Sequence, residues 1–361
     1  MPERFVSIII PVRNEAAHIA RCLDSVLAQD LAGIGHEVLV VDGMSDDGTL
    51  KTISEYEGRI QQLRVLDNPK RGVAAGRNLG IKAARGDVLV MLDAHARYAA
   101  DYVKRCLEVM QKTGAANVGG PAVALPGGRS AMAQAIALAH RSPFGLGAGQ
   151  FRNPRAEGFV ETVWPGCFRR EVFEKAGSID QRRSRTEDLE FNARLRAAGF
   201  TIYLSPLIRA WYYCRTTLGG TWRQRWADGY EITRFLPDNP AAPKPRHFVP
   251  LVFVSGLLLS GAAALLLPGR SPWAPLATIV FWSIVGAYFS ASLYFAARSA
   301  CLVTRSYNNC APMVTQSHDN SDVAMLRIAV LLPVVFATLH FSYGLGSLWG
   351  LATLPFVSHR T

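Results

Sequence analysis

Apolar and polar positions alternate in blocks through the first two thirds of the chain. Short apolar runs with few interruptions are typical of buried strands, and apolar residues at spacings of three and four are typical of one helix face. The pattern predicts strand 6–12, helix 19–27, strand 38–41, helix 49–56, strand 63–66, helix 73–84, strand 88–92 and helix 102–110. Buried strands joined by helices predict an α/β domain with a mostly parallel sheet.

The last third of the chain contains long stretches without any Asp, Glu, Lys or Arg. These stretches are 248–268, 271–297 and 328–358. A helix of about 20 apolar residues can cross the hydrocarbon core of a bilayer. Each stretch is long enough, so we predict about three membrane segments rather than buried helices of a soluble core.

Basic residues beside these stretches predict their orientation. Lys244 and Arg246 precede the first stretch, and three arginines lie in the 298–327 connection. Because basic loops stay in the cytoplasm, we expect a multi-pass protein of the inner cell membrane with its N-terminal domain in the cytoplasm. The third stretch contains Pro333 and His340, which fit a tilted span, a broken helix or a re-entrant segment equally well.

Charge and cysteine content narrow the chemistry further. The net charge of +11 suits anionic membrane lipids and diphosphate substrates. Nucleic acid is the competing partner for a basic protein, but no nucleic-acid-binding motif accompanies the charge, and we expect none to be bound. The six cysteines, Cys310 among them, contain no C-x-x-C pair, which favours buried free thiols over a zinc site.

Polar residues follow several of the predicted strands directly. The segment 13–15 follows the first strand, 42–45 the second and 93–95 the fourth. A single Asp after a strand is usually a turn or cap residue. Ligands of α/β sheets bind beyond the carboxyl ends of the strands, so we expect the three segments to meet at one rim and form a site.

The side chains at this rim suit a nucleotide diphosphate attached to a sugar. Asp42 can accept hydrogen bonds from a base imide or a ribose, although the same loop, with Ser45 and 47–49, also fits an Asx turn and a helix cap. The segment 72–78 places small residues and one cation at the start of a helix. That arrangement suits the close approach of a phosphate.

Two further pairs suit a metal ion and a base. Asp93 and His95 are one residue apart beyond a buried strand, and a carboxylate with an imidazole suits Mn²⁺ or Mg²⁺. Such an ion would neutralise a diphosphate leaving group. Glu187 and Asp188 begin a predicted helix, where carboxylates complement the helix dipole. One of them can also accept the proton of an acceptor hydroxyl during sugar transfer with inversion.

These short motifs occur in a fixed order. They are Ile10-Pro11-Val12-Arg13-Asn14-Glu15, Val41-Asp42-Gly43-Met44-Ser45-Asp46-Asp47-Gly48-Thr49, Gly76-Arg77-Asn78-Leu79-Gly80, Gly86-Asp87 with Asp93, Pro165-Gly166-Cys167-Phe168-Arg169-Arg170, Glu187-Asp188 and Arg225-Trp226. The series resembles the family 2 glycosyltransferases with a GT-A fold, over roughly residues 5–235. With the membrane tail, the chain is most similar to the bacterial membrane enzymes of succinoglycan and exopolysaccharide synthesis.

The membrane segments predict a membrane-associated, lipid-linked acceptor, to which we expect a single hexose to be added. The resemblance implies an inverting enzyme that moves this hexose from a nucleotide diphosphate-sugar, above all a UDP-sugar. Its implied cofactor is Mn²⁺ or Mg²⁺, and its implied pathway is exopolysaccharide or cell-envelope glycan synthesis. The implied residues are Pro11, Arg13, Asn14 and Glu15 at the nucleotide, Asp42 and Ser45 at the base and ribose, Arg77 and Asn78 at the diphosphate, Asp93 and His95 at the metal, Asp188 as the base, and Glu187, Arg225 and Trp226 at the acceptor or diphosphate.

The sequence departs from the family pattern at two positions. His95 replaces the usual second metal-binding carboxylate, and Trp222 replaces the Gln of the Gln-x-x-Arg-Trp motif of processive synthases. No apolar span precedes the domain, so we expect addition of one sugar rather than extrusion of a chain. A transferase that charges polyprenyl phosphate and a non-catalytic membrane partner with the same fold stay open. A dinucleotide-dependent oxidoreductase is disfavoured because 11–15 replaces the Gly-rich fingerprint.

The expected domain organisation follows from the resemblance and the hydropathy pattern. We expect a catalytic domain over 1–235 and a basic juxtamembrane linker over 236–247. A membrane region over 248–358 completes the expected organisation.

Overall fold

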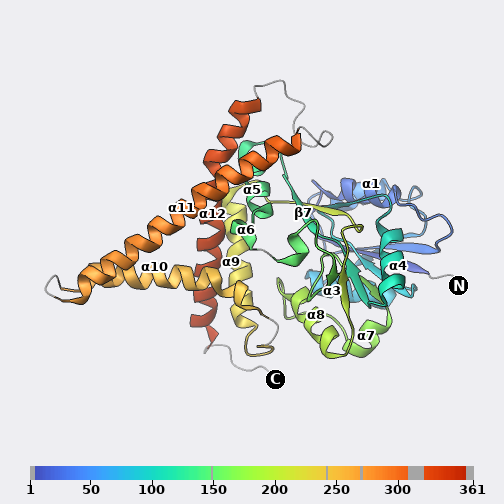
Figure 1. Ribbon diagram of the computed structural model, residues 1–361. Coiled ribbons are helices and arrows are strands. Elements are labelled where there is room, and N and C mark those ends of the chain that lie inside the picture. Colours follow the sequence, from blue (N-terminus) through green and yellow to red (C-terminus); the bar gives the residue numbers. More distant parts are fainter. Residues whose placement is uncertain (1–4, 148, 241–242, 269–270, 308–320, 355–361) are drawn as a thin grey trace. The chain divides into compact units, whose positions relative to one another are not determined.

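The computed structural model describes residues 5–147, 149–240, 243–268, 271–307 and 321–354 (Figure 1). The chain divides into two compact units, and each is described by itself. The first unit comprises Met1–Val123 and Gly149–Tyr213, and the second comprises Ala124–Ala148 and Cys214–Thr361.

The first unit is built around an eight-stranded sheet with the order β3-β2-β1-β4-β9-β6-β10-β8. Strands β1 to β4 are mutually parallel, as the apolar runs predicted, whereas β9 runs antiparallel to β4 and β6, and β8 antiparallel to β10. The antiparallel strands have two or three residues each, too few to leave a periodic pattern in the sequence. The bounds are β1 Val6–Val12, β2 His36–Asp42, β3 Leu63–Asp67, β4 Val88–Met91, β6 Asn117–Gly119, β8 Gly158–Phe159, β9 Cys167–Arg169 and β10 Ile202–Leu204.

Alternate residues of the central strands enter two separate apolar layers. Ile8 and Ile10 of β1 pack in the layer that contains α1 and α4, whereas Ile9 packs in the layer that contains α3 and α8. This burial on both faces explains why the strands are continuously apolar. The helices are α1 Ile19–Leu27, α2 Thr49–Ser54, α3 Val73–Ala83, α4 Tyr102–Thr113, α7 Glu171–Ala176 and α8 Glu187–Ala197.

The parallel register sets the edge at which the polar loops emerge. Val12, the last residue of β1, pairs with Asp42, the last residue of β2, so the loops that follow both strands leave the sheet side by side. A second sheet has the order β5-β11-β7. Its strand β5 directly follows the polar segment 93–95 and pairs antiparallel with β11. Its strands are β5 Ala96–Tyr98, β7 Ala122–Leu125 and β11 Ala210–Tyr213.

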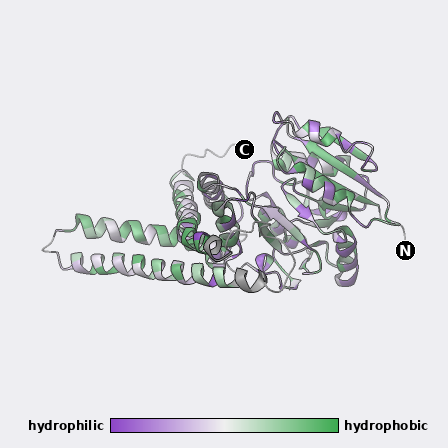
Figure 2. Cartoon of the chain, turned by 90° about the horizontal axis from the view of Figure 1, so that it is seen from above, coloured by the Kyte–Doolittle hydropathy of each residue, from purple (hydrophilic) through white to green (hydrophobic). Residues whose placement is uncertain are grey.

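The second unit is helical. It contains α5 Ala131–Arg141, α6 Pro143–Leu146, α9 Leu218–Arg234, α10 Val249–Leu266, α11 Trp273–Tyr307 and α12 Ser321–Ala352. By length and composition, three of the described helices can cross a membrane, within Pro245–Leu266, Trp273–Cys301 and Leu326–Ala352. Much of the ribbon of α10 and α11 has the green of hydrophobic residues in Figure 2.

Helices α11 and α12 each extend, at one end, beyond the apolar stretches from which they were predicted. Helix α11 continues to Tyr307 and α12 begins at Ser321, so both enter the 298–327 connection that we expected to be a loop. The reason is that a charged residue ends an apolar stretch without ending a helix. Positions 355–358 of the third predicted segment and the thiol of Cys310 lie outside the described residues.

Candidate active site

The loops after β1 and β2 are joined to each other by hydrogen bonds. The Asn14 backbone N–H donates to Ser45 Oγ at 2.9 Å, and the Asn14 amide donates to Asp46 Oδ1 at 2.9 Å and accepts from the Asp46 N–H at 3.0 Å. Asn14 adopts a positive φ of 53°, which Asn tolerates better than most residues. Two of the three predicted rim segments therefore form one fixed surface.

Asp42 lies at the base of this surface and is 1% exposed. Its Oδ1 accepts from Ser45 Oγ at 2.6 Å and its Oδ2 from the Ser45 N–H at 3.0 Å. The side chain thus makes the predicted turn. A carboxylate oxygen has two lone pairs, so this turn leaves acceptor capacity for a ligand.

Glu15, in the loop after β1, is held by residues of the loop after β2. The Glu15 N–H donates to Thr49 Oγ1 at 2.8 Å, and Asp47 accepts from the Thr49 N–H at 3.1 Å, as in an Asx turn. The expected side-chain cap of α2 is not made, because its N-cap residue is Gly48. Glu15 Oε1 lies 3.2 Å from Nδ1 of His95, which brings the third rim segment to the first.

Arg77 connects the sheet rim to α8. Its Nη2 lies 3.2 Å from Asp93 Oδ1, and its Nη1 lies 3.3 Å from Glu187 Oε1, with all three side chains nearly buried. The preceding residue, Gly76, packs so closely on Pro11 that an added Cβ would lie 3.3 Å from the proline ring. This close approach of α3 to β1 positions Arg77 beside the carboxylates of Asp93 and Glu187.

Asp93 has a second strong donor. Trp164 donates its indole N–H to Asp93 Oδ2 at 2.6 Å, and Tyr98 donates its hydroxyl hydrogen to the Asp93 carbonyl at 3.3 Å. Burial alone would raise the pKa of Asp93, but the charge of Arg77 and the Trp164 hydrogen bond outweigh it and lower the pKa. Asp93 is therefore held as an ionised carboxylate.

Glu187 and Asp188 are in a different electrostatic state. Burial raises the pKa of Glu187 to about 7, with Arg77 opposing this shift and Asp188 adding to it. Burial also raises the pKa of Asp188, against the charge of Arg77. Within the described part of the chain, Glu187 Oε2 is buried and has no hydrogen-bond partner. A group with a raised pKa and a vacant acceptor atom suits proton transfer.

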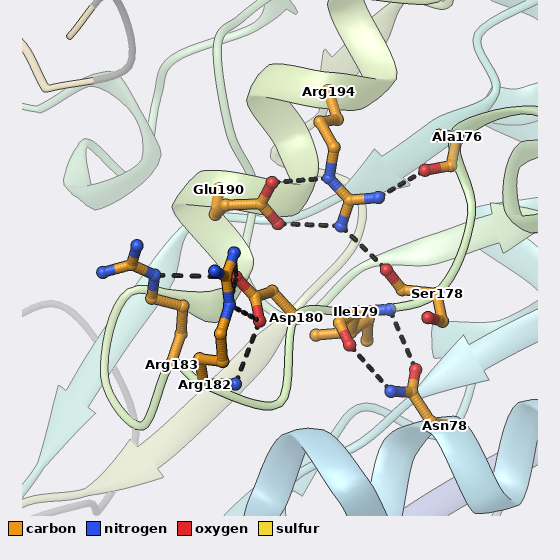
Figure 3. A network of polar contacts seen from close by, with 9 residues as sticks. All are labelled: Asn78, Ala176, Ser178, Ile179, Asp180, Arg182, Arg183, Glu190 and Arg194. Atoms are coloured by element: carbon orange, nitrogen blue, oxygen red, sulfur yellow. Dashed lines mark hydrogen bonds and ion pairs between the residues drawn. The ribbon is translucent and has the colours of Figure 1, made fainter. Parts of the chain in front are cut away.

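A polar network fixes the segment that precedes α8 (Figure 3). Arg194, inside α8, donates to the Ser178 carbonyl at 2.8 Å and to Glu190 Oε2 at 2.8 Å. The Asn78 side chain donates to the Ile179 carbonyl at 2.7 Å and accepts from the Ile179 N–H at 2.9 Å. The Asn78 side chain thus links α3 to the segment that precedes α8. Its contact with a diphosphate remains a prediction.

A cavity of about 320 Å³ lies between the start of α3 and the same segment. Its volume is at the lower end of the range for small-molecule sites. Two of the residues that line it, Lys70 and Arg183, are basic, so its walls are suited to an anion. The lining residues are Lys70, Gly72, Val73, Ala74, Ala75, Gln181, Arg183 and Ser184.

Comparisons with known proteins identify the family. The profile of glycosyl transferase family 2 matches residues 7–177. The succinoglycan biosynthesis protein ExoA of Rhizobium meliloti is 31% identical over 247 residues, which is 68% of this chain and 74% of that protein. The chain belongs to glycosyl transferase family 2.

Two further proteins are similar to this family 2 glycosyltransferase. One is the dolichyl N-acetyl-alpha-D-glucosaminyl phosphate 3-beta-D-2,3-diacetamido-2,3-dideoxy-beta-D-glucuronosyltransferase of Methanococcus voltae, 30% identical over 59% of this chain and 68% of that protein. The other is the mannosyltransferase PcManGT of Pyrobaculum calidifontis, solved with GDP-Man and Mn²⁺. It is 19% identical, with a TM-score of 0.54 over 95% of this chain and 87% of the other. The fold is thus of the predicted GT-A type.

The donor set for a divalent ion in this glycosyltransferase is small. Among the described residues, no group of three or more His, Cys, Asp or Glu side chains could hold a metal ion. Asp93 and His95 nevertheless fit a metal that takes its other ligands from a diphosphate and water. Asp93 is ionised, and its oxygens retain lone pairs beside the Arg77 and Trp164 hydrogen bonds.

The remaining predicted residues have these positions. Arg13 follows β1, is exposed and packs against Gly43. Arg225 and Trp226 lie on α9 in the second unit. Arg225 makes an ion pair with Asp228 at 2.8 Å there, and its contact with donor or acceptor remains a prediction.

Sequence reasoning did not find two residues of the candidate site. Trp164 precedes β9 in a segment without periodicity, and only its place directly before Pro165-Gly166-Cys167 could have signalled it. Asn68 is 4% exposed, donates its N–H to the Asp42 carbonyl at 2.7 Å and donates its side-chain amide to the Gly72 carbonyl at 3.0 Å. Asn68 follows the third predicted strand, and a polar residue at that strand end is the signal that could have identified it.

Proposed function

We propose that this family 2 glycosyltransferase is an inverting hexosyltransferase. Its donor is a nucleotide diphosphate-sugar, above all a UDP-sugar, and it adds one hexose to a lipid-linked acceptor in exopolysaccharide or cell-envelope glycan synthesis. The observation that carries the proposal is Arg77, which ties Asp93 at the end of β4 to Glu187 beside the proposed base. The names of the two relatives, one in succinoglycan biosynthesis and one acting on a dolichyl-phosphate sugar, support the pathway and the acceptor class.

The donor nucleotide is proposed to lie on the joined loops after β1 and β2. Asp42 and Ser45 accept from the base and ribose, and Pro11, Arg13, Asn14 and Glu15 line the same surface. The hydrogen bonds between the loops hold these groups in position before the donor arrives. Such preorganisation lowers the entropic cost of binding.

The proton is proposed to move from the acceptor hydroxyl to Asp188. Because burial raises the pKa of Asp188, its carboxylate is a stronger base than an exposed aspartate. The hydroxyl oxygen then bonds to the anomeric carbon, while the bond from that carbon to the diphosphate oxygen breaks and its electron pair leaves with the diphosphate. An α-linked donor gives a β-linked product.

The negative charge of the leaving diphosphate is proposed to be stabilised by two positive charges, a metal ion and Arg77. Asp93 and His95 would hold Mn²⁺ or Mg²⁺, which when bound supplies positive charge to the diphosphate. Arg77 supplies a fixed cation nearby, and Arg225, Trp226, Asn78 and Glu187 are proposed further contacts with the diphosphate or the acceptor.

The boundaries and location follow as part of the same proposal. We propose a catalytic domain over 1–235, a basic linker over 236–247 and a membrane region over 248–358, with the catalytic domain in the cytoplasm. The three long apolar helices support association with a membrane.

The test is transfer by the purified full chain. The protein is incubated with a panel of nucleotide-sugars and Mn²⁺, with and without lipids extracted from a membrane, and nucleotide diphosphate release is measured. We expect release with one sugar class, stimulated by the lipid fraction, and a β-linkage in the product by NMR. Release without any dependence on Asp188, or an α-linked product from an α-linked donor, contradicts the proposal.

A transferase that charges polyprenyl phosphate directly is the second candidate. Its support is the basic, membrane-associated character of the chain, which suits a phosphorylated lipid. Radiolabelled sugar transferred to pure polyprenyl phosphate would favour it, whereas label that requires a lipid already carrying a sugar favours the first proposal.

A further inference from the structure

The three long apolar helices of the second unit differ in what covers them. In α10 and α11, 6% of the most apolar window is buried, whereas in α12 the share is 44%. Their mean hydropathies, 2.2, 1.7 and 1.9, are nevertheless similar. A helix that crosses a bilayer on its own is surrounded by lipid, so the covered face of α12 calls for a physical explanation.

Helix α9 covers much of that face. A Cβ on Gly346 of α12 would overlap the backbone of Trp226 on α9, so the two helices touch at their backbones. Thr233 of α9 also donates its hydroxyl hydrogen to the Ser347 carbonyl at 3.2 Å. Figure 1 shows the two helices side by side. Residues 343–350 of α12 therefore share their environment with α9.

Helix α9 is unsuited to the hydrocarbon core. Charged side chains are costly at the bilayer centre. Five of its 17 residues are charged, so the part of α12 that lies along it also lies outside the core. The charged residues are Arg223, Arg225, Asp228, Glu231 and Arg234.

The rest of α12 is short for a crossing. Positions 326–342 number about 17 residues, and at 1.5 Å per residue they span about 25 Å. The hydrocarbon core is about 30 Å thick. Within this stretch His340 also hydrogen-bonds the Phe144 carbonyl of α6 at 2.6 Å, so protein surrounds part of it as well.

The hairpin of α10 and α11 meets α12 at the end where the chain enters α10. A Cβ on Gly344 would lie within 3 Å of Pro250 and Val254, in the first turns of α10, and the rings of Phe253 and Phe341 are 5.5 Å apart. In Figure 1, α10 runs across α12 rather than along it, and Figure 2 shows the hairpin extending away from α12. A hairpin along the membrane normal therefore puts α12 in the membrane plane.

An apolar stripe on α12 lies on the same face as the hairpin. Leu326, Val330 and Val334, at four-residue spacing, are 66%, 66% and 49% exposed. Phe341, which touches α10, follows Val334 by two helical turns and so continues the stripe. The exposed apolar side chains thus face the direction in which the hairpin leaves, while the opposite face of α12 is buried.

We propose that α10 and α11 cross the membrane as a hairpin and that α12 lies in the surface of the leaflet where α10 begins. Its stripe would be immersed in lipid at the boundary of headgroups and acyl chains, as in interfacial helices, and its other face packs on α9. The basic residues Lys244 and Arg246 before α10 mark this leaflet as cytoplasmic. The chain then crosses twice, and both its ends lie on one side.

The number of crossings is tested on the full chain in bacterial cells. Green fluorescent protein, which fluoresces in the cytoplasm, and alkaline phosphatase, which is active in the periplasm, are each fused after Thr361. We expect fluorescence and no phosphatase activity. Active phosphatase with no fluorescence would mean three crossings and would overturn the proposal.

A cysteine at the hairpin tip supplies the matched control. Ser271→Cys, in a chain with Cys301→Ser and Cys310→Ser, is treated in intact cells with a membrane-impermeant maleimide. We expect labelling well above the chain without Ser271→Cys, because the tip lies across the membrane. Labelling only after the cells are opened would show that the hairpin does not cross, and would equally overturn the proposal.

The depth of α12 is tested with fluorophores in vesicles of phosphatidylethanolamine and phosphatidylglycerol. Single cysteines replace Leu326, Val330, Val334 and Leu351 in the same background and are labelled, and quenching by lipids brominated at different depths is measured. We expect one shallow depth at all four positions. A profile deepest in the middle of α12, like that expected along α11, would show a crossing helix. None of the three experiments depends on the proposed transferase activity.

Discussion

The two halves of the candidate active site are built in opposite ways. The loops after β1 and β2 are held by several hydrogen bonds among Asn14, Asp42 and Ser45. The carboxylate half depends on Arg77, a single buried cation between Asp93 and Glu187. A site distributed over many weak bonds loses little when one is removed, whereas a site centred on one buried charge loses its whole arrangement.

The largest effect is expected in the carboxylate half, from Asp188→Asn. Removing the proposed proton acceptor should lower kcat for sugar transfer by about 10²- to 10⁴-fold, while the Kd for the nucleotide changes little. Transfer assays and calorimetric titration with the nucleotide measure the two quantities. A variant with unchanged kcat would remove Asp188 from the chemistry.

Arg77→Met is expected to act on the fold as well as on transfer. It leaves Asp93 and Glu187 buried beside each other without their shared cation, which costs about 3–5 kcal/mol. Thermal unfolding of the purified protein should show a clearly lower Tm. Arg64→Met is a suitable comparison, because Arg64 also pairs with a buried carboxylate, Glu37, but is itself 40% exposed. Equal shifts for the two variants would contradict a special role for the Arg77 pair.

The rate of transfer should depend on pH through the carboxylate half of the site. Since the pKa of Glu187 is raised to about 7, Glu187 is protonated below that pH and ionised above it. Its ion pair with Arg77 is complete only above pH 7, so transfer should rise with pH through that value, by about tenfold if the pair contributes ~1.4 kcal/mol. Glu187→Gln should abolish the step and leave a low, flat profile. A step retained in Glu187→Gln would assign the titration to another group.

The smallest effect is expected in the nucleotide half, from Ser45→Ala. The variant removes hydrogen bonds to Asn14 and Asp42, each contributing about 1 kcal/mol. We expect KM for the donor to rise severalfold while kcat stays nearly constant, because the proton acceptor is untouched. A loss as large as that of Asp188→Asn would mean that both halves are equally sensitive.

The sequence predicted the parts of this fold that repeat. The apolar runs over 6–12 and 88–92 are strands β1 and β4, and helix α8 begins at Glu187, one of the two carboxylates expected at a helix start. Periodicity reports burial over many residues, so long elements are predicted and the short strands β8 and β9 are not. Individual partners such as Trp164 have no periodicity, and only the folded chain brings its indole to Asp93.

Hydropathy alone does not distinguish α12 from the other two long apolar helices. Hydropathy reports how favourable it is to remove a segment from water, and burial in lipid and burial in protein both remove it from water. The mean hydropathies of α11 and α12 are similar, 1.7 and 1.9, but 6% of the most apolar window of α11 is buried and 44% of that of α12. The distinction depends on which helix lies opposite, which no local window can detect.

The close packing of α9 on α12 also sets an order of events during synthesis. Thr233 and its partner Ser347 are 114 residues apart, and Phe144 and His340 are 196 residues apart. At about 5–20 residues per second, α9 leaves the ribosome roughly 6–23 s before the stretch of α12 that it contacts. The face of α9 that packs on α12 stays uncovered until the hairpin has been made, so this unit completes its folding last. Premature termination after α11 would leave that face open to aggregation.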